Sequence, residues 1–239
     1  MGIIEDCRIK TYLSGGSVRD KLLGIKPKTY NYTAVAYLSF RGFIKIINKE
    51  GKIYKAWPNY LTVRARLKNK DVTIVMARTD EEYKDGRHPD EVMQTRSLKE
   101  DSLRRDFTIN AMYMGDNGKI YDFHNGRQHL KEKKIVCIGN PQEKFKEDYT
   151  RILRAMRLSS QLDFSIDRST LIAMGKVSHN INLIEPNILR DEINKSLEYD
   201  SVKTLKMLSH LDIWDVLKSN KLNLFLSTRE VKCQQEKEE

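Results

Sequence analysis

Short runs of apolar and β-branched residues alternate with polar residues along the first 140 positions of the chain. Such runs lie at residues 27–36, 60–67, 71–76, 119–123 and 135–138, and this pattern predicts strands. Residues 11–24 predict a strand, a Gly-Gly turn and a helix with Val18, Leu22 and Leu23 on one face. The run at 107–114 is typical of a strand or of a strand that leads into a helix. We therefore expect residues 1–140 to form a small mixed sheet with helices.

The hydrophobic period changes after Pro141. Apolar positions such as Ile152, Leu153 and Met156 then recur every three or four residues, which predicts helices as far as residue 228. The last stretch, residues 229–239, is charged and has almost nothing to bury, so we expect a disordered tail. The pattern predicts an α+β fold in which a mixed-sheet domain (1–140) precedes an all-helical domain (141–228).

The composition adds a strong positive charge. The 239 residues include 43 Lys and Arg against 33 Asp and Glu, a net charge of +10. Such a charge favours polyanionic partners, nucleic acid first, although a generally solvated basic surface explains it equally well. Cys7, Cys137 and Cys233 are far apart and odd in number, so we expect free thiols and neither a disulfide framework nor a zinc site. No run approaches the roughly 18 apolar residues of a membrane span, and we expect a cytoplasmic protein without membrane contact.

Four segments carry motifs of known type. They are GGSVRDKLLGIKPK (15–28), LRRDFTINAM (103–112), DFHNGRQHL (122–130) and EDYTRILRAMR (147–157). In order and spacing they resemble the class II tRNA nucleotidyltransferases, or CCA-adding enzymes, and the bacterial poly(A) polymerases. The resemblance covers about residues 11–200. It implies a nucleotidyltransferase-type head at 1–140 and a helical, RNA-binding neck at 141–228.

The first segment suits a phosphate group. A Gly-rich turn offers backbone N–H groups, and a fixed guanidinium adds charge-assisted hydrogen bonds. Gly15, Gly16 and Arg19 fit this role for a nucleoside triphosphate. Without the other motifs, an ordinary turn is the preferred interpretation of Gly15-Gly16.

The second segment places two cations and an acid directly before a strand-like run. The resemblance implies that Arg104, Arg105 and Asp106 recognise the ribose and triphosphate of the nucleotide, with Asn110 completing the motif. A simple salt bridge between Asp106 and a neighbouring arginine is the alternative interpretation.

The fourth segment has the spacing of one helical turn. Glu147 and Arg151 are four residues apart, and Asp148 is beside them. The resemblance implies that Asp148 and Arg151 read the base of CTP or ATP in place of a nucleic-acid template, and an ion pair within a helix is the alternative. Arg154 and Arg157 extend the basic edge of this helix, where they contact RNA phosphate or are merely solvated.

The third segment departs from the pattern. The resemblance associates Asp122 and Gly126 with a hinge between head and neck, and it leads us to expect an acid where this chain has His129.

A second departure concerns the metal. Nucleotide transfer on the two-metal plan needs carboxylates that hold Mg²⁺, and the resemblance places two aspartates soon after the first motif. Thr29 and Asn31 stand at those positions, and no Asp or Glu lies between Asp20 and Glu50. Asp71 is the remaining acid that we expect near the site, and a single acid is a poor two-metal site.

Two functions follow from these observations. One is a transferase that binds ATP or CTP, Mg²⁺ and an RNA 3′ end, most plausibly that of tRNA, and adds nucleotides without a template. The other is a catalytically inactive nucleotide- and RNA-binding regulator or competitor on the same fold, which the neutral Thr29 and Asn31 favour.

Overall fold

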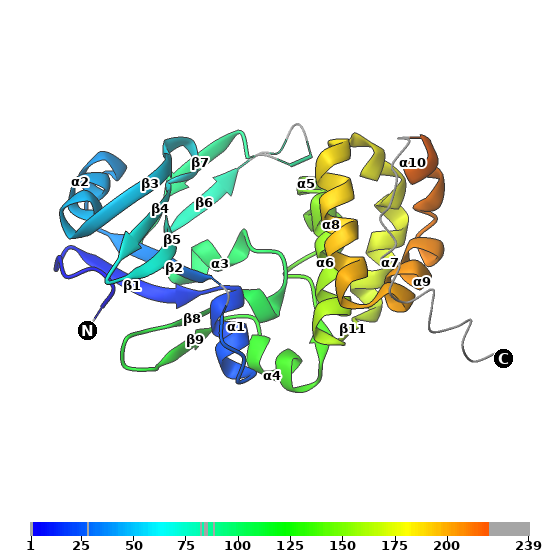
Figure 1. Ribbon diagram of the computed structural model, residues 1–239, viewed down its shortest axis with the longest axis horizontal. Coiled ribbons are helices and arrows are strands. Elements are labelled where there is room, and N and C mark those ends of the chain that lie inside the picture. Colours follow the sequence, from blue (N-terminus) through cyan, green and yellow to red (C-terminus); the bar gives the residue numbers. More distant parts are fainter. Residues whose placement is uncertain (1, 28, 82, 84–85, 88, 220–239) are drawn as a thin grey trace. The chain divides into compact units, whose positions relative to one another are not determined.

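The computed structural model of the protein describes residues 2–27, 29–81, 83, 86–87 and 89–219 (Figure 1). The chain forms two compact units. The first contains Met1–Lys84, His88–Glu132 and Val136–Gly139, and the second contains Asp85–Arg87, Lys133–Ile135 and Asn140–Glu239. The tail at 229–239 and Cys233 lie outside the described residues.

A mixed sheet dominates the first unit. Its strands are β1 (Ile9–Ser14), β2 (Tyr30–Ala36), β3 (Gly51–Trp57), β4 (Thr62–Leu67), β5 (Lys70–Met76), β8 (Met112–Met114) and β9 (Ile120–Asp122). Their order in the sheet is β3-β4-β5-β2-β1-β8-β9, which Figure 1 displays from β3 at the top to β9 at the bottom. Strands β2 and β5 pair in parallel, and the other neighbours pair antiparallel.

Helices and a hairpin surround this sheet. They are α1 (Gly16–Leu22), α2 (Phe40–Glu50), α3 (Leu98–Leu103), α4 (Gly126–Lys131) and the hairpin of β6 (Arg78–Glu81) with β7 (Glu91–Gln94). Two 3₁₀ turns, η1 (Pro58–Tyr60) and η2 (Thr108–Asn110), precede β4 and β8.

Alternation along the strands divides the sheet into two faces. Helix α2 packs on one face, where Phe43 and Ile47 join a core with buried residues of β2, β4 and β5. Successive side chains of a strand point to opposite faces. The residues between the core positions, such as Asn31 on β2, Arg64 on β4 and Thr73 on β5, therefore occupy the face away from α2.

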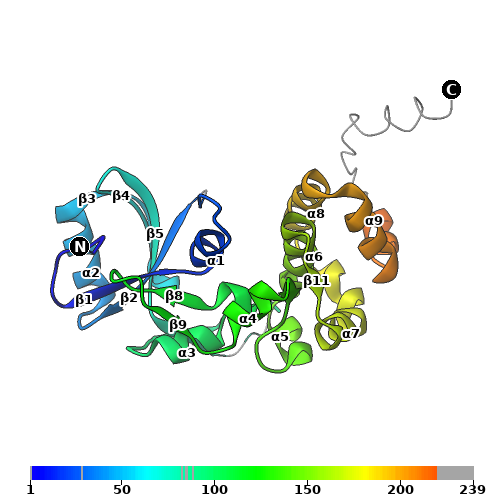
Figure 2. The same cartoon turned by 90° about the horizontal axis from the view of Figure 1, so that it is seen from below.

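The second unit is mainly helical (Figure 2). It contains α5 (Pro141–Glu147), α6 (Thr150–Leu162), α7 (Arg168–Val177), η3 (Ser178–Leu183), α8 (Pro186–Tyr199), α9 (Ser201–His210), α10 (Trp214–Ser219) and the parallel pair β10 (Lys134–Ile135) and β11 (Ser165–Ile166). Helix α6 packs against α8 and α9, and α5 packs against α7.

The predicted α+β fold is confirmed, with local differences. The run at 135–138 does not extend the main sheet, because β10 pairs with β11 and Cys137 forms an isolated bridge to Phe107. The run at 107–114 forms a 3₁₀ turn followed by a strand. On α1, Val18 is buried as expected, but Leu22 is 36% exposed because the helix ends there.

Two absences concern the described residues alone. No helix in this part of the chain is long and apolar enough to cross a membrane. Cys7 is exposed, Cys137 is buried, and neither of these two described cysteines forms a disulfide.

Candidate functional site

The Gly15-Gly16 turn joins β1 to α1. Gly15 has φ 65° and ψ −140°, a conformation that glycine adopts without steric cost. Its N–H donates to the carbonyl of Met112 at 3.2 Å. A Cβ at Gly15 would lie 3.2 Å from Nη1 of Arg105, and one at Gly16 would lie 3.4 Å from Nη2 of Arg19. The positive φ and the nearby Arg105 guanidinium explain the glycine at position 15, whereas the separation at Gly16 is an ordinary van der Waals contact.

Arg19 connects two of the predicted motifs. Its guanidinium is buried, with Nη1 donating to Oδ1 of Asn110 at 2.9 Å. Its Nε and Nη2 donate to Oδ1 of Asp20 at 2.9 and 2.6 Å. The structure thus brings together Arg19 and Asn110, two residues that were each predicted to bind the nucleotide, and it adds the carboxylate of Asp20.

A buried carboxylate that sequence analysis missed lies behind the second motif. Asp101 on α3 has no exposed side-chain surface. Its Oδ1 accepts from Nε of Arg104 at 3.0 Å and from the Arg78 N–H at 3.1 Å. Its Oδ2 accepts from Nη2 of Arg105 at 3.1 Å and from the Tyr113 hydroxyl at 2.7 Å. Asp101 therefore fixes the positions of both predicted phosphate ligands.

The charges of this cluster shift its acid–base equilibria. Burial alone would raise the pKa of Asp101, but the guanidinium groups of Arg104 and Arg105 outweigh it and lower the pKa to about 2. Burial raises the pKa of Tyr113, which therefore stays a neutral hydrogen-bond donor to Asp101. Burial opposes the charge of Arg105, but Tyr113 and Asp101 raise its pKa. At neutral pH the cluster therefore joins one carboxylate to two guanidinium groups and keeps a net positive charge.

Arg105 also reaches the sheet face away from α2. Its Nη2 donates to Oγ1 of Thr33 at 2.9 Å, and its Nη1 donates to the carbonyl of Asn110 at 3.3 Å. Asp106 is buried, and its Oδ1 accepts from Nδ2 of Asn110 at 3.4 Å. Gly15, Arg105, Asp106 and Asn110 consequently form one cluster, while their role in binding stays a prediction.

The two positions expected to carry metal-binding carboxylates lie side by side. Nδ2 of Asn31 donates to Oγ1 of Thr29 at 3.5 Å. The hydroxyl of Ser17, on α1, donates to the carbonyl of Thr29 and accepts from the N–H of Asn31, both at 2.9 Å. Helix α1 therefore holds this pair at the start of β2, but neither side chain carries a charge.

Asp71, the remaining acid expected near the site, lies on β5, and its metal role stays a prediction. The residue of β5 that pairs with Asn31 is Thr73. Asp71 is 57% exposed, accepts from the Tyr54 hydroxyl at 2.8 Å and lies 4.0 Å from Nε of Arg66. The described residues contain no group of three or more side chains that could hold a metal ion. Hard Mg²⁺ prefers charged oxygen ligands, so the residues present do not fit the two-metal arrangement that the resemblance implies.

The motif of the second unit that was expected to read the base is built differently from the prediction. Helix α5 ends at Glu147 and Asp148 is extended, with φ −151°, so the motif spans a helix–helix junction and not a single helix. Oδ1 of Asp148 accepts from the N–H of Thr150 at 2.9 Å, which starts the next helix. Arg151 is 5% exposed, and its Nη1 donates to Glu147 at 2.7 Å and to the Lys144 carbonyl at 2.8 Å. The predicted ion pair therefore forms across the junction.

The predicted RNA contacts of α6 are partly enclosed. Arg154 and Arg157 are half-buried. Nε of Arg157 donates to Oε2 of Glu192 on α8 at 2.7 Å, and Lys195 lies 3.6 Å from the same carboxylate. Glu192 was not identified from the sequence, and it compensates the charge that Arg157 would offer to a phosphate.

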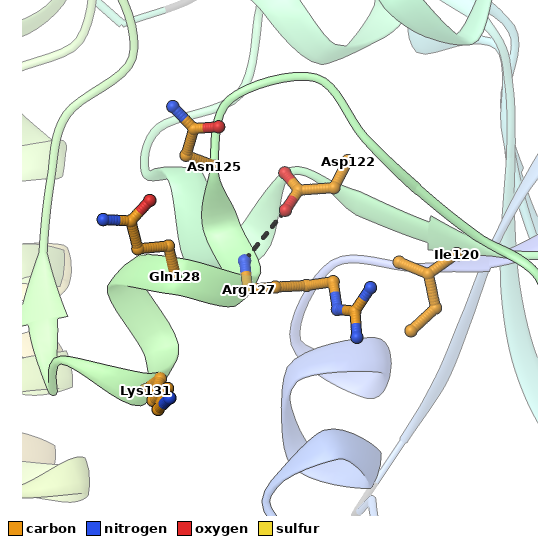
Figure 3. A pocket seen from close by; sticks show the side chains of 6 residues that line it. All are labelled: Ile120, Asp122, Asn125, Arg127, Gln128 and Lys131. Carbon is orange, nitrogen blue, oxygen red and sulfur yellow. Dashed lines mark hydrogen bonds between the residues drawn. The ribbon is translucent and has the colours of Figure 1, made fainter.

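The third motif forms the start of α4. Oδ1 of Asp122 accepts from the Gly126 N–H at 2.8 Å. Its Oδ2 accepts from the Arg127 N–H at 2.9 Å, and Figure 3 draws this second hydrogen bond. A Cβ at Gly126 would lie 2.3 Å from the Thr108 carbonyl, so a close backbone approach requires glycine. His129, found where an acid was expected, shares a 2.9 Å hydrogen bond between its Nδ1 and Oγ1 of Thr108.

A surface pocket of about 590 Å³ lies beside this helix. Figure 3 labels its lining residues, which are Ile120, Asp122, Asn125, Arg127, Gln128 and Lys131. Gly15, Arg19 and Arg105, which were predicted to bind the nucleotide, do not line it. The pocket therefore lies outside the candidate site.

Two protein families match this chain. The Poly A polymerase head domain matches residues 11–136, and the probable RNA and SrmB-binding site of polymerase A matches residues 163–220. The first match covers more than half of the chain.

The chain is also similar in sequence to individual CCA-adding enzymes. The chain is 39% identical over 181 residues to the CCA-adding enzyme of Ligilactobacillus salivarius, covering 76% of this chain and 44% of that protein. It is 39% identical over 167 residues to the CCA-adding enzyme of Enterococcus faecalis, covering 70% and 40%. The chain therefore spans less than half the length of these two relatives.

Solved structures of CCA-adding enzymes share the fold. The Bacillus stearothermophilus enzyme in complex with CTP superposes with a TM-score of 0.75 at 28% identity, over 84% of this chain and 48% of that one. The Thermotoga maritima enzyme complexed with a tRNA superposes with a TM-score of 0.71 at 28% identity, over 87% and 48%.

Proposed function

This chain belongs to the family of the poly(A) polymerase head domain and the CCA-adding enzymes, and we propose that it binds ATP or CTP and the 3′ end of a tRNA. One relative has been solved in complex with CTP and another in complex with tRNA, and we propose the same two kinds of ligand for this chain.

The cluster at the Gly15-Gly16 turn supports the nucleotide part of the proposal. Arg19 donates to the side chain of Asn110, which lies 91 positions further along the chain, and Arg105 donates to the carbonyl of the same residue. A triphosphate needs several fixed N–H donors at once, and buried guanidinium groups in a preformed network lose little rotamer freedom on binding. Asp148 and Arg151 of the second unit are the proposed readers of the base.

The pair Thr29 and Asn31 carries the second part of the proposal. The resemblance implies carboxylates at these two positions, whereas the side chains present are neutral and hydrogen-bonded to each other. Without carboxylates the site lacks the charge that would concentrate divalent cations between a 3′ hydroxyl and the α-phosphate. We infer that the protein binds its ligands but transfers nucleotides slowly or not at all. If transfer is absent altogether, the protein is an inactive regulator or competitor that only binds these ligands.

Isothermal titration with CTP and with ATP tests the binding part. We expect affinities between micromolar and millimolar in the absence of divalent metal, because the proposed contacts are made by side chains of the protein. Arg19→Ala and Arg151→Ala should each weaken binding by about 1 to 3 kcal/mol, the range for hydrogen bonds to charged groups. Lys45→Ala, on the outer surface of α2, is the matched control and should leave affinity unchanged. Equal affinities in all four proteins would rule out the assigned site.

A further inference from the structure

Four cations lie together on the sheet face away from α2. Lys52 and Lys55 belong to β3, and Arg64 and Arg66 belong to β4; all four are exposed. The strand register pairs Lys52 with Arg66 and Lys55 with Arg64. A β-bulge between Ile53 and Lys55 returns Lys55 to the same face as Lys52. We call these four residues the basic strip.

The basic strip lowers the stability of the sheet when no anion is bound to it. Like charges directly opposite each other on neighbouring strands destabilise a sheet, and here two such pairs follow in succession. Asp71 is the one carboxylate among the residues of β3, β4 and β5, and it lies 4.0 Å from Arg66. A single acid leaves most of this positive charge uncompensated, so the arrangement is suited to an anion that the chain itself does not supply.

Aromatic side chains accompany the cations. Trp57 ends β3 opposite Thr62, and Nζ of Lys55 lies 5.0 Å from the centre of its ring. Tyr54, in the bulge, is 46% exposed. Proteins that bind single-stranded nucleic acid combine two features. Positively charged side chains contact the sugar–phosphate backbone, and aromatic side chains stack on the bases.

The position of the strip relates it to the candidate site. Arg64 pairs with Thr73 of β5, and Thr73 pairs with Asn31 of β2. Neighbouring strands are about 4.8 Å apart, so Arg64 lies roughly 10 Å across the same sheet face from the Thr29–Asn31 pair. An RNA whose 3′ end reached Asn31 could therefore extend over the strip.

We propose that the basic strip binds the sugar–phosphate backbone of single-stranded RNA next to its 3′ end. This inference rests on the proposed function, and it adds an RNA contact surface in the first unit to the contacts expected from α6. The nucleotide contacts at Arg19 and Arg105 do not involve the strip, so the two can be perturbed separately.

Fluorescence anisotropy with a labelled single-stranded oligoribonucleotide ending in CC tests the proposal. The variant is Arg64→Gln with Arg66→Gln, and the control is Arg41→Gln with Lys45→Gln, which removes the same charge from the exposed side of α2. Each phosphate contact with a single strand contributes about 0.7 to the slope of log K against log salt. We expect the strip variant to lose about 1.4 from this slope and to bind roughly 25-fold more weakly at 0.1 M salt. The control should change neither value by a comparable amount.

Two further measurements separate the possible failures. Thermal unfolding should show the strip variant at least as stable as the wild type, because the substitutions relieve like-charge repulsion; a large loss of stability would overturn the inference. CTP binding by calorimetry should be unchanged in the strip variant. If RNA binding is equal in the variant and the control while CTP still binds, the strip proposal is wrong and the nucleotide site stands. If wild-type protein binds no CTP, the proposed function itself is wrong.

Vesicles containing anionic phosphatidylserine provide the remaining comparison. If the strip variant loses vesicle binding while its RNA binding is unchanged, the strip is a membrane-binding surface and the RNA proposal is overturned. Loss of RNA binding in this variant, with its vesicle binding equal to that of the wild type, supports the proposal.

Discussion

Replacing Asp101 with asparagine should strongly destabilise the first unit. The carboxylate is completely buried and lies between Arg104 and Arg105, which approach it at 2.9 and 3.1 Å. The neutral amide of the substitute could keep part of the hydrogen bonding but would leave two enclosed guanidinium groups without their counter-ion. Removing one partner of a buried ion pair typically costs about 3 to 5 kcal/mol, which is a large share of the roughly 5 to 15 kcal/mol that stabilises a typical protein.

The pH dependence of stability gives an independent estimate. Arg104 and Arg105 overcome the effect of burial and hold the pKa of Asp101 at about 2 instead of 3.8. A lowered folded-state pKa stabilises the fold above the unfolded-state pKa, and this contribution is lost as pH falls from about 4 to 2. The difference corresponds to roughly 2 kcal/mol. Asp101→Asn should lack this part of the acid sensitivity.

Urea unfolding followed by circular dichroism between pH 2 and 7 measures both effects. Asp71→Asn is the control, because Asp71 is 57% exposed and its loss should change stability by about 0.5 kcal/mol or less. If Asp101→Asn were as stable as this control at pH 7, the account of Asp101 as the carboxylate that holds both arginines would be refuted.

Further expectations follow from backbone packing and charge compensation. Gly126→Ala should destabilise the protein by about 1 to 3 kcal/mol in thermal unfolding, because the new Cβ would meet the Thr108 carbonyl at 2.3 Å. Gly175→Ala in α7, where a Cβ meets nothing within 4 Å, should instead stabilise it by about 0.4 to 1 kcal/mol. Arg157→Gln should weaken RNA binding in the anisotropy assay less than Arg66→Gln does, because Glu192 already pairs with Arg157; the reverse order would contradict this.

Local signals predicted much of the first unit. The strands predicted at 60–67 and 71–76 form β4 and β5, and Lys68 and Asn69 between them have the positive φ values, 46° and 59°, of a tight hairpin turn. The glycine pair before α1 was also recognisable, because a strand followed by Gly-Gly and an amphipathic period is a local pattern. Helix α2 was not identified, although Phe43 and Ile47 have helical spacing, because an apolar run of this length does not by itself specify its secondary structure.

The interactions between distant residues were not predictable. Asp101 stands three and four residues before Arg104 and Arg105, a spacing that signals helix ion pairs, but its burial depends on Tyr113 and on the Arg78 backbone. The helical spacing of apolar residues continues past Asp148, although the helix itself is interrupted there. The side chain of Asp148 caps the next helix, and the spacing alone does not reveal this interruption.

The grouping of the four cations in the basic strip was also not predictable from the sequence. In a regular strand Lys52 and Lys55, three residues apart, would face opposite sides. The bulge beside Tyr54 places them on one face, and the pairing with Arg64 and Arg66 requires the register of two strands. None of this is encoded in the spacing of charged residues.

The central claim is that Thr29 and Asn31 leave a nucleotide-binding fold without the charge needed for metal-dependent transfer. The direct test is incubation of the protein with CTP, ATP, Mg²⁺ and tRNA lacking its CCA end, with product length read on a denaturing gel. We predict low or undetectable addition by the natural sequence and a strong rise in the variant that combines Thr29→Asp with Asn31→Asp, with much less effect of either change alone because the two carboxylates would act together. Addition by the natural sequence at ordinary enzyme rates, on the order of 1 s⁻¹ or more, would contradict the account.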